Sequence, residues 1–338
     1  MLPIIFGTSS LGNLYEELPF DQKLAIVKAC VESSNGGITF FDSAGKYGAG
    51  LSLKSLSDCL EALQVPPEKV LISNKLGWYS IPMLGDVQQF EPGVWVNLIN
   101  DAEQRISYAG ILECFEQGNE FLGNYPAQMV SIHDPDDFID AAINNDEKAH
   151  RYLLVLEAFK ALKELKEKGI VQSVGVGAKN WKIIQKISQD VDLDWIMVAN
   201  SLTIHSHDSA LIEFIADISL KNIQVFNAAI FNGGFLTGGD YYNYAWVNPN
   251  TPEGTTLIQW RDAFFTLCNA CNILPAEACF YFSSRIKGVK AIALNTYLPE
   301  QIKSNAEMIT KIIPDTFWLA LVEQKLASKS LLKILELL

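Results

Sequence analysis

The chain has 338 residues, of which 49% are hydrophobic, and its formal net charge is −13 at pH 7. This length and apolar content allow a large core, and as one domain they match the size of an α/β barrel. The negative charge argues against a nucleic-acid backbone or an anionic membrane surface as the partner. No apolar run approaches the roughly 18 residues that a membrane span requires.

The N-terminus and the cysteines both predict a cytoplasmic protein. Residues 1–6 form a short apolar start without the basic flank of a signal peptide. Six cysteines are present, and two of them, Cys268 and Cys271, form a CxxC pair. No second CxxC accompanies it, and the neighbouring apolar residues Trp260, Phe264 and Leu267 recur at helical spacing. We therefore expect reduced, packed thiols rather than a metal or redox site.

Eight short apolar, β-prone runs recur along the chain and predict strands. They lie at residues 3–7, 38–42, 70–75, 129–133, 171–176, 195–199, 223–230 and 289–294.

Helical patterns separate most of these runs. They lie at residues 21–34, 52–63, 150–168, 180–189, 208–219 and 299–312, and a further helix-like stretch follows residue 105. Lys166, Lys168 and Gly169 form a typical helix end. Strands that alternate with helices in this way predict a (β/α)8 TIM barrel that occupies residues 1–338 as a single domain. The active site of such a barrel lies at the C-terminal ends of its strands.

Three segments depart from this rhythm. Residues 76–105 and 231–256 form long connections, and loops of this length are usually functional. Beyond the last barrel helix, residues 317–321 and 331–338 look like amphipathic helices. We expect them to pack on the barrel; alternatively they form a subunit contact. The sequence does not decide between a monomer and a homodimer.

Four reactive side chains gather at the ends of the second, third and fourth strands. Asp42 ends the run Ile-Thr-Phe-Phe, and Tyr47 follows in a glycine-flanked turn. Lys75 ends the third strand and His133 the fourth. Each residue alone has an ordinary structural explanation, such as a cap or a solvated charge. Together they predict a catalytic cluster at one mouth of the barrel.

These four residues resemble the catalytic tetrad of the aldo-keto reductase family. The resemblance includes the segments around them, which are Phe-Asp-Ser-Ala, Ser-Asn-Lys and Ile-His-Asp-Pro. Segments 106–112, 175–181 and 233–238 are most similar to its aldose 1-dehydrogenase group, which comprises D-threo-aldose, L-fucose and L-galactose dehydrogenases. The similarity runs along nearly the whole chain. Ala109 departs from the group, which would have an acidic residue there.

The resemblance implies an NAD(P)-dependent oxidoreductase. Its substrate would be the anomeric C1 hydroxyl of an aldose of the L-fucose, L-galactose or D-arabinose type, oxidised to a lactone. Tyr47 would transfer the proton, although a phenol has an ordinary pKa of about 10. Lys75 would lower that pKa, Asp42 would hold Lys75, and His133 would orient the substrate oxygen. The alternatives are an NADPH-dependent aldehyde or ketone reductase and a cofactor-binding regulatory subunit.

The resemblance also assigns the cofactor site. Gly7, Thr8 and Asp42 would approach the nicotinamide, and Asn180, Asn200 and Ser201 its carboxamide. The pyrophosphate and adenosine would be held by two loops, after the seventh and eighth strands. Their residues are Ala229, Phe231, Gly233, Gly234, Leu236, Asn295, Thr296, Gln301 and Asn305.

NAD is the expected cofactor rather than NADP. Asn295 and Gln301 occupy the positions where cations would bind the extra phosphate of NADP. Glu300 would repel that phosphate, and Lys303 is the one nearby cation in the sequence.

Aromatic residues that suit a sugar pocket are Tyr15, Trp78, Tyr79 and Trp246, beside His133. The expected chemistry uses no metal, so we interpret His205 to Asp208 as a helix start rather than a metal site. Asp134, Asp136 and Asp137 suggest a glycosidase acid pair. The seventh strand, however, ends without the second carboxylate that such a pair requires.

Overall fold

The computed structural model describes residues 3–85, 88–308 and 311–337. Eight parallel strands close into a barrel in the order β1-β12-β9-β8-β7-β6-β3-β2. Each strand overlaps one of the eight predicted runs, which confirms the (β/α)8 barrel. Their bounds are β1 (Ile4–Gly7), β2 (Thr39–Ala44), β3 (Val70–Leu76), β6 (Met129–His133), β7 (Ser173–Ala178), β8 (Trp195–Ala199), β9 (Gln224–Ala228) and β12 (Val289–Leu294).

The barrel strands are buried along almost their whole length. All five residues of β6 are buried, as are six of the seven in β3. Parallel strands that are covered on both faces need continuous apolar runs rather than an alternating pattern. The polar residues within these strands therefore stand out, because the fold gives them little access to water.

The chain divides into two compact units. The N-terminal unit comprises Ile4–Ile196 and Ala293–Ser304, and the C-terminal unit comprises Met1–Pro3, Met197–Ile292 and Asn305–Leu338. The single domain expected from the sequence stays a prediction.

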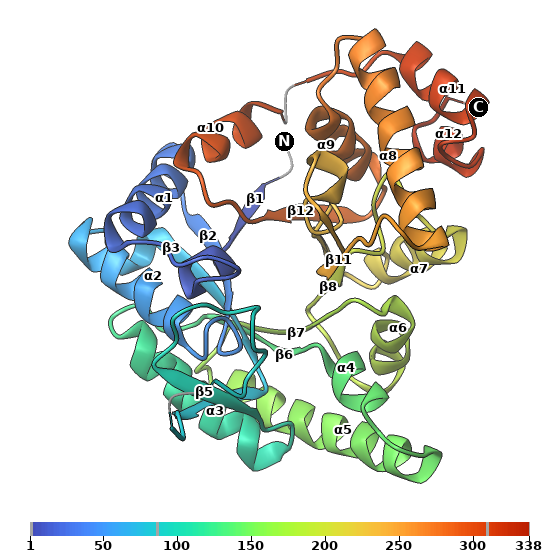
Figure 1. The fold of residues 1–338 in the computed structure, drawn as a ribbon. Helices are drawn as coiled ribbons and strands as arrows, with labels where there is room; N and C mark the ends of the chain where they lie inside the picture. The colour runs from blue at the N-terminus through green and yellow to red at the C-terminus, as the bar shows by residue number, and fades with distance from the viewer. Residues whose placement is uncertain (1–2, 86–87, 309–310, 338) are drawn as a thin grey trace. The chain divides into compact units, whose positions relative to one another are not determined.

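Helices surround the strands of the N-terminal unit (Figure 1). Neighbouring pairs α1–α2, α2–α3 and α3–α5 pack against one another, and α5 also packs on β6 and β7. The elements are η1 (Ser9–Gly12), α1 (Phe20–Ser33), α2 (Leu51–Ala62), η2 (Pro67–Lys69), α3 (Tyr108–Leu122), α4 (Pro135–Asp140), α5 (Asn145–Glu167) and α6 (Trp181–Asp190).

Local sequence explains where these helices begin and end. The Ser107 hydroxyl accepts a hydrogen bond from Gly110 N at the start of α3, and Asn144 caps α5 in the same way. Gly169 has a φ of 70° just after α5, as the predicted helix end requires.

The long connection after β3 contains a hairpin. β4 (Trp78–Pro82) pairs antiparallel with β5 (Asn100–Gln104), and Trp78 lies opposite Gln104. The side chain of Gln117 in α3 bonds both backbone groups of Ser80, which holds the hairpin against that helix.

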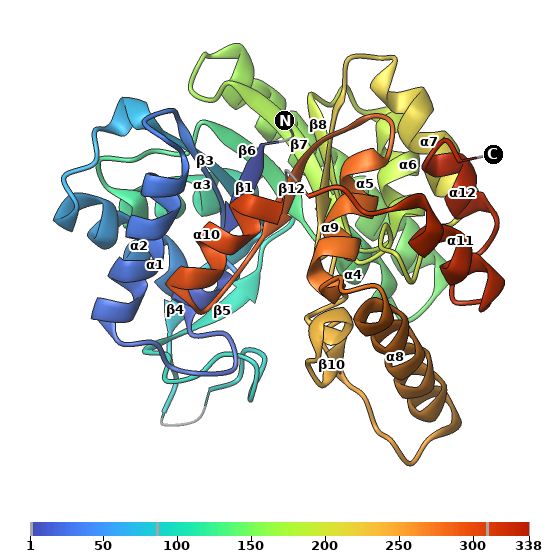
Figure 2. The same ribbon diagram turned by 90° about the horizontal axis from the view of Figure 1, so that it is seen from above.

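In the C-terminal unit the long α8 packs against α9 and α11 (Figure 2). The Trp260 indole in α8 donates to Leu326 O at 2.8 Å. The elements are α7 (Ser209–Ser219), η3 (Phe235–Thr237), β10 (Tyr241–Tyr242), β11 (Ala245–Trp246), α8 (Pro252–Ala270), α9 (Pro275–Arg285), α11 (Asp315–Glu323) and α12 (Ser330–Ile334), and α10 (Pro299–Met308) spans both units.

Several boundaries differ from the predictions. Helices α3, α4, α8 and α9 lie outside the six predicted ranges, although a helical pattern after residue 105 and around residue 260 pointed to two of them. α10 ends at Met308 rather than at residue 312, and residues 309–310 and 338 of the predicted helices lie outside the described part of the chain.

The structure has helices α11 and α12 where the sequence predicted two amphipathic helices after the barrel. α11 buries Phe317, Trp318 and Leu321 completely, as an amphipathic helix should.

Among the residues described, no single helix has the length and apolar content to cross a membrane. The bent pair α8 and α9 reaches those limits only when its two helices are taken together.

Candidate active site

Asp42 and Lys75 form a buried ion pair on neighbouring strands. β2 pairs with β3 so that Ala44 lies opposite Lys75. Lys75 Nζ lies 2.5 Å from Asp42 Oδ2 and also donates to Ser43 O at 3.2 Å. Only 4% of the Lys75 side chain and 6% of the Asp42 side chain are exposed. Neither charge is well hydrated, so each depends on the other for stabilisation.

Tyr47 and His133 lie beside this ion pair. The turn after β2 carries Tyr47, and its backbone N–H donates to Ala44 O at 3.1 Å. Lys75 Nζ lies 4.8 Å from the centroid of the Tyr47 ring. The His133 ring meets the Tyr47 ring edge-on, with centroids 5.5 Å apart. The structure thus brings together the four side chains that the sequence predicted to cluster.

The Tyr47 hydroxyl is held in its protonated form. Burial raises the pKa of Tyr47 well above its ordinary value, and the negative charges of Asp42 and Asp134 raise it further. This direction is opposite to the expected lowering by Lys75. The ammonium of Lys75 is paired with Asp42 at short range and approaches the face of the ring, so burial dominates.

His133 is held as a neutral imidazole. Burial lowers the pKa of His133 well below its ordinary value, and the positive charges of Lys75, Lys46 and Lys179 lower it further. Its Nδ1 atom is buried and has no hydrogen-bond partner among the described residues. At neutral pH this side chain can therefore donate one hydrogen bond without carrying a charge.

Two glycines fix the turn that carries Tyr47. A Cβ atom on Gly12 would lie 2.8 Å from the Tyr47 carbonyl carbon and 2.9 Å from its oxygen. Gly48 has a φ of 62°, and a Cβ there would lie 2.3 Å from Gly12 O. Because any side chain at either position would clash with backbone, the turn and η1 pack directly together. The sequence pointed to Gly48 but not to Gly12.

An aromatic layer covers Tyr47. It consists of Leu14, Tyr15, Trp78, Phe90 and Trp95, which pack with Tyr47 in one cluster. The ring centroids of Tyr47 and Trp95 are 5.7 Å apart, and those of Trp78 and Phe90 are 5.0 Å apart. Tyr15 and Trp78 were predicted to line the substrate pocket. Trp95 was missed, although it lies in the long loop that the sequence marked as functional.

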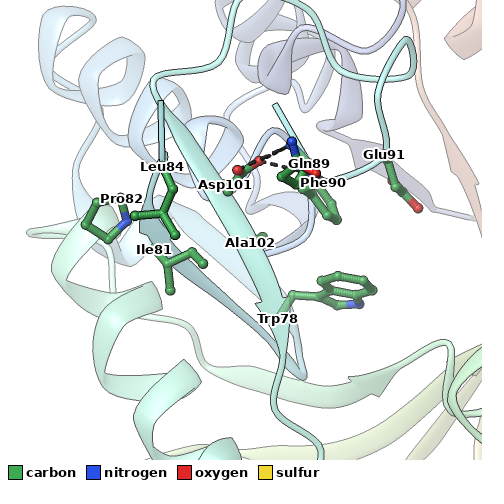
Figure 3. A pocket seen from close by; sticks show the side chains of 9 residues that line it. All are labelled: Trp78, Ile81, Pro82, Leu84, Gln89, Phe90, Glu91, Asp101 and Ala102. Atoms are coloured by element: carbon green, nitrogen blue, oxygen red, sulfur yellow. Dashed lines mark hydrogen bonds between the residues drawn. The ribbon is translucent and has the colours of Figure 1, made fainter. Parts of the chain in front are cut away.

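A cavity of about 340 Å³ adjoins the aromatic layer. In Figure 3 Asp101 reaches from β5 to the backbone N–H groups of Gln89 and Phe90, and these hydrogen bonds hold the loop against the hairpin. The cavity is lined by Trp78, Ile81, Pro82, Leu84, Gln89, Phe90, Glu91, Asp101 and Ala102. None of the four clustered catalytic candidates is among them, whereas Trp78 and Phe90 of the aromatic layer are.

The predicted cofactor residues of the N-terminal unit lie around the end of β1. Thr8 donates to Asp42 O from both its N–H and its hydroxyl, at 3.1 and 3.2 Å. Asn295 Oδ1 accepts from the Ser10 hydroxyl at 3.0 Å, and a Cβ on Gly7 would lie 3.3 Å from Asn295 Cβ. Thr296 and Gln301 hydrogen-bond each other. The start of η1 and the segment after β12 therefore share one network.

Asp136 holds the backbone of Asn180, the predicted carboxamide ligand. Asp136 Oδ2 accepts from Asn180 N at 2.8 Å and from Lys179 N at 3.2 Å. Its Oδ1 atom is buried and has no partner among the described residues. Burial and the charge of Asp134 raise the pKa of Asp136 to about 6. The sequence treated Asp136 only as a possible glycosidase acid and gave no sign of this structural role.

We expect Asp136 to impose a pH dependence on stability that Asp136→Asn removes. Because the pKa of Asp136 is higher in the folded protein than its ordinary 3.8, folding favours the protonated form. This stabilisation is complete below the unfolded pKa and is lost as the pH rises through about 6. Between pH 4 and 7, the free energy of unfolding of Asp136→Asn should therefore rise by on the order of 1–3 kcal/mol relative to that of wild type.

Urea unfolding of both proteins across that range measures the difference. Asp136→Ala is the matched control, because it removes the acceptor for two backbone N–H groups. It should be destabilised by about 1–3 kcal/mol. Parallel stability curves for wild type and Asp136→Asn would contradict the assignment.

In the C-terminal unit, Asn200 presents a primary amide without a partner. Asn200 is 4% exposed, and neither its Oδ1 nor its Nδ2 has a hydrogen-bond partner among the described residues. Such an amide offers one donor group and one acceptor, which is the complement of the carboxamide of a nicotinamide. Asn200 has a φ of 62°, and its backbone N–H donates to Ala228 O at 3.3 Å.

The loop after β9 turns sharply through several left-handed residues. Ala229, Asn232, Gly233 and Gly234 all have positive φ values, between 49° and 94°. Asn232 Nδ2 donates to Asn200 O at 3.1 Å, which ties the loops after β8 and β9 together. Leu236 is buried in η3. Two N–H groups of the loop donate within it, Asn232 N to Ala229 O at 2.9 Å and Gly234 N to Phe231 O at 3.1 Å. Glycines at such a turn let a ligand approach the backbone closely.

Two further substrate residues were predicted, Tyr79 and Trp246. Tyr79 follows Trp78 in β4 and so faces the opposite side of the hairpin, where the Arg105 guanidinium stacks on its ring at 3.8 Å. Trp246 lies on β11 in the C-terminal unit and is 57% exposed. The structure does not bring Tyr79 to the aromatic layer, and aromatic character alone did not reveal this orientation. The substrate role of Trp246 stays a prediction.

The remaining sequence motifs have local roles. Asp208 accepts from Ala210 N at 2.9 Å and so starts α7, as predicted. His205 Nδ1 lies 2.9 Å from the Tyr242 hydroxyl, and its ring packs edge-on against Trp260. All six cysteines are free thiols; Cys268 is buried, whereas Cys271 is exposed rather than packed. The described residues contain no group of three or more His, Cys, Asp or Glu side chains arranged for a metal.

Comparison with known families gives a match along nearly the whole chain. The model of the aldo/keto reductase family matches residues 3–323. The chain is 27% identical over 337 residues to the pyridoxal 4-dehydrogenase of Microbacterium luteolum, covering 95% of this chain and 93% of the relative. It is 24% identical over 334 residues to the D-threo-aldose 1-dehydrogenase of Pseudomonas sp, with the same coverage. The L-galactose dehydrogenase of Arabidopsis thaliana is 22% identical over 308 residues, covering 91% and 84%.

Solved structures share the fold. The glycerol dehydrogenase of Gluconobacter oxydans superposes with a TM-score of 0.66 at 18% identity, covering 95% of this chain and 90% of that chain. An aldo-keto reductase of Bacillus halodurans in its holo form gives a TM-score of 0.65 at 19% identity, covering 96% and 92%.

Proposed function

Because the chain belongs to the aldo/keto reductase family, whose members are oxidoreductases that use nicotinamide cofactors, we propose that it is an aldose 1-dehydrogenase. It oxidises the anomeric C1 hydroxyl of an aldose to a lactone. The observation that carries this proposal is the buried Asp42–Lys75 ion pair below Tyr47, with neutral His133 at the edge of the ring. Two relatives named for the oxidation of aldoses and L-galactose support the sugar as substrate.

The four residues divide the chemistry among them. His133 donates a hydrogen bond to the substrate oxygen and orients it. Tyr47 takes the proton from that oxygen while the C1–H bond breaks and a C1=O double bond forms. Lys75 stabilises the phenolate that is needed for this step, and Asp42 holds Lys75 in position. The nicotinamide, when bound, supplies the acceptor for the hydride, which carries the electron pair of the C1–H bond.

Three regions fit the cofactor. The unpartnered amide of Asn200 suits the carboxamide, and Asn180 lies on a backbone that Asp136 fixes. The left-handed loop from Ala229 to Gly234 suits the pyrophosphate, and residues 295–305 suit the adenosine. These roles are proposals that follow the family pattern and the local geometry of each loop.

Aldehyde or ketone reduction is a second candidate. The raised pKa of Tyr47 favours it, because a protonated phenol is the donor that a reduced carbonyl oxygen needs. A panel of aldoses with NAD, and of aldehydes with NADH and NADPH, separates the two activities when absorbance of the reduced nicotinamide is followed. Rapid oxidation of an aldose supports the proposal. Turnover of aldehydes alone would select the reductase, and turnover of neither would leave a binding subunit.

We expect NAD to be preferred over NADP by about tenfold or more in kcat/KM, since a matched cation on the NADP phosphate contributes roughly 1.5–3 kcal/mol. Asn295 and Gln301 offer no positive charge, and both already bond neighbouring side chains, Ser10 and Thr296. Glu300 adds a negative charge at an exposed position. Measuring both cofactors with one good aldose gives the ratio.

Two variants sharpen this prediction. Gln301→Arg should raise kcat/KM for NADP while leaving that for NAD within a few fold, because its fork matches phosphate oxygens. Lys303→Met tests the exposed lysine of the same segment. A wild-type preference for NADP that Lys303→Met abolishes would show that the assignment of the phosphate position is wrong.

A further inference from the structure

Asp134 stands at the start of α4 but does not cap it. It occupies the N-cap position with a left-handed backbone, φ 45° and ψ 54°, and its side chain makes no capping hydrogen bond. Its backbone N–H donates to Gly177 O at 3.0 Å, which fixes this conformation against β7. An aspartate at an N-cap normally bonds the first N–H groups of its helix. Here the carboxylate is directed elsewhere, and strained backbone of this kind is frequent at functional sites.

The Asp134 carboxylate faces three nitrogen atoms around the catalytic candidates. Its Oδ2 atom lies 3.7 Å from His133 Nε2, 3.8 Å from Lys46 Nζ and 3.7 Å from Lys179 Nζ. None of these separations is short enough for a hydrogen bond. The Lys179 ammonium instead forms an ion pair with Asp137, whose Oδ2 atom lies 2.6 Å from Nζ. The carboxylate therefore keeps unused acceptor capacity directly beside the imidazole that we assign to the substrate oxygen.

Lys46 links this carboxylate to the aromatic layer. It precedes Tyr47 in the chain, its side chain is 12% exposed, and its Nζ lies 3.0 Å from Glu91 Oε1. Nζ also lies 5.3 Å from the centroid of the Trp78 ring. The Trp78 Nε1 atom is buried and has no hydrogen-bond partner among the described residues. Charged donors and acceptors thus stand next to aromatic faces.

We propose that Asp134 and Lys46 select a polyhydroxylated substrate by binding a hydroxyl group next to the reacting carbon. This inference rests on the aldose 1-dehydrogenase function proposed above. A hydroxyl both donates and accepts, so it can bridge the carboxylate of Asp134 and the ammonium of Lys46. The nearby faces of Trp78 and Tyr47 suit the C–H surface of a sugar ring.

A purely structural ion pair is the competing explanation. Lys46 has a closer partner in Glu91, and a largely buried ion pair of this kind can hold the loop in place without touching a substrate. The two explanations differ in what they predict for substrates. A structural pair affects all substrates alike, whereas a hydroxyl-binding pair affects only those that carry the hydroxyl.

A cycle of enzyme variants and substrate analogues tests this difference. The aldose that wild type oxidises best is compared with its mono-deoxy analogues, for wild type, Asp134→Asn and Lys46→Met. Asparagine tolerates the left-handed backbone of position 134, so Asp134→Asn keeps the fold. In wild type one deoxy analogue should lose about tenfold or more in kcat/KM, the size of a hydrogen bond to a charged group. In the variants that loss should shrink to less than about threefold.

Asp140→Asn is the matched control, since Asp140 also lies on α4 but pairs with the exposed Lys148. It should retain the full wild-type loss for the deoxy analogue. Equal losses for every analogue in wild type and in Asp134→Asn would overturn the inference while leaving the proposed function intact. Oxidation of no aldose by wild type would instead refute the proposed function, and the inference with it.

Discussion

Tyr47→Phe should abolish turnover while the cofactor still binds. The change removes the hydroxyl that moves the proton but keeps the ring, which packs on Trp95 and His133. General acid–base groups contribute about 10²–10⁴-fold, so kcat should fall by that factor. The Kd for NAD should stay within about threefold, because the phenol is a proton carrier in this assignment and the cofactor loops are unchanged. Steady-state kinetics and quenching of tryptophan fluorescence measure the two quantities.

Tyr125→Phe is the control for Tyr47→Phe. Tyr125 is also buried, and its hydroxyl donates to Val65 O at 2.8 Å, away from the clustered residues. Loss of the Tyr125 hydroxyl should lower the free energy of unfolding by about 1 kcal/mol and leave kcat unchanged. Near-normal turnover in Tyr47→Phe would disprove the proposed mechanism, because no other hydroxyl has been assigned to the proton.

Lys75→Met should slow oxidation by about 10²-fold or more and move its pH dependence upward. Oxidation needs Tyr47 as a base, so its rate rises as the pH approaches the pKa of Tyr47, which burial already raises. Removing the ammonium takes away a positive charge and leaves Asp42 without its partner. Both changes disfavour the phenolate, so the pKa of Tyr47 rises further. Profiles of kcat/KM against pH for the two enzymes show the shift.

Stability has to be followed for the same variant, because an unpaired buried Asp42 costs about 3–5 kcal/mol. The double variant Asp42→Asn/Lys75→Met removes that charge and should recover part of the stability but not the activity. Lys54→Met changes an exposed lysine that pairs with Asp58 on α2, and should behave as wild type. An active Lys75→Met enzyme with an unchanged pH profile would show that Lys75 does not tune Tyr47.

The barrel and the clustering of the four catalytic candidates were predictable because both depend on short stretches of sequence. Continuous apolar runs mark parallel strands, and a charged or aromatic residue at the end of such a run marks the barrel mouth. Asp42, Lys75 and His133 each follow this rule. Parallel strands bring these ends together whatever the intervening loops contain.

The residues that were missed depend on contacts between distant parts of the chain. Trp95 is one aromatic among several in its loop, and only the folded loop places it on Tyr47. Asp136 acts on a backbone more than 40 residues away. Tyr79 faces away from the aromatic layer, and its aromatic character in a long loop did not reveal which way it faces. The direction of the Tyr47 pKa also escaped prediction, because it depends on burial and not on the neighbouring lysine alone.

The contact between Gly12 and Gly48 has a consequence for changing the substrate range by directed evolution. Any side chain at either glycine strikes backbone, so replacement would displace the turn that carries Tyr47. Libraries that randomise these positions should yield almost only inactive clones, whatever substrate is used for selection. The loop around Trp95 is less restricted at Gly93, where an added Cβ meets no atom within 4 Å, although a φ of 81° disfavours residues other than Asn and Asp. Asn or Asp introduced at Gly93 changes this loop while the Tyr47 phenol stays where two glycines hold it.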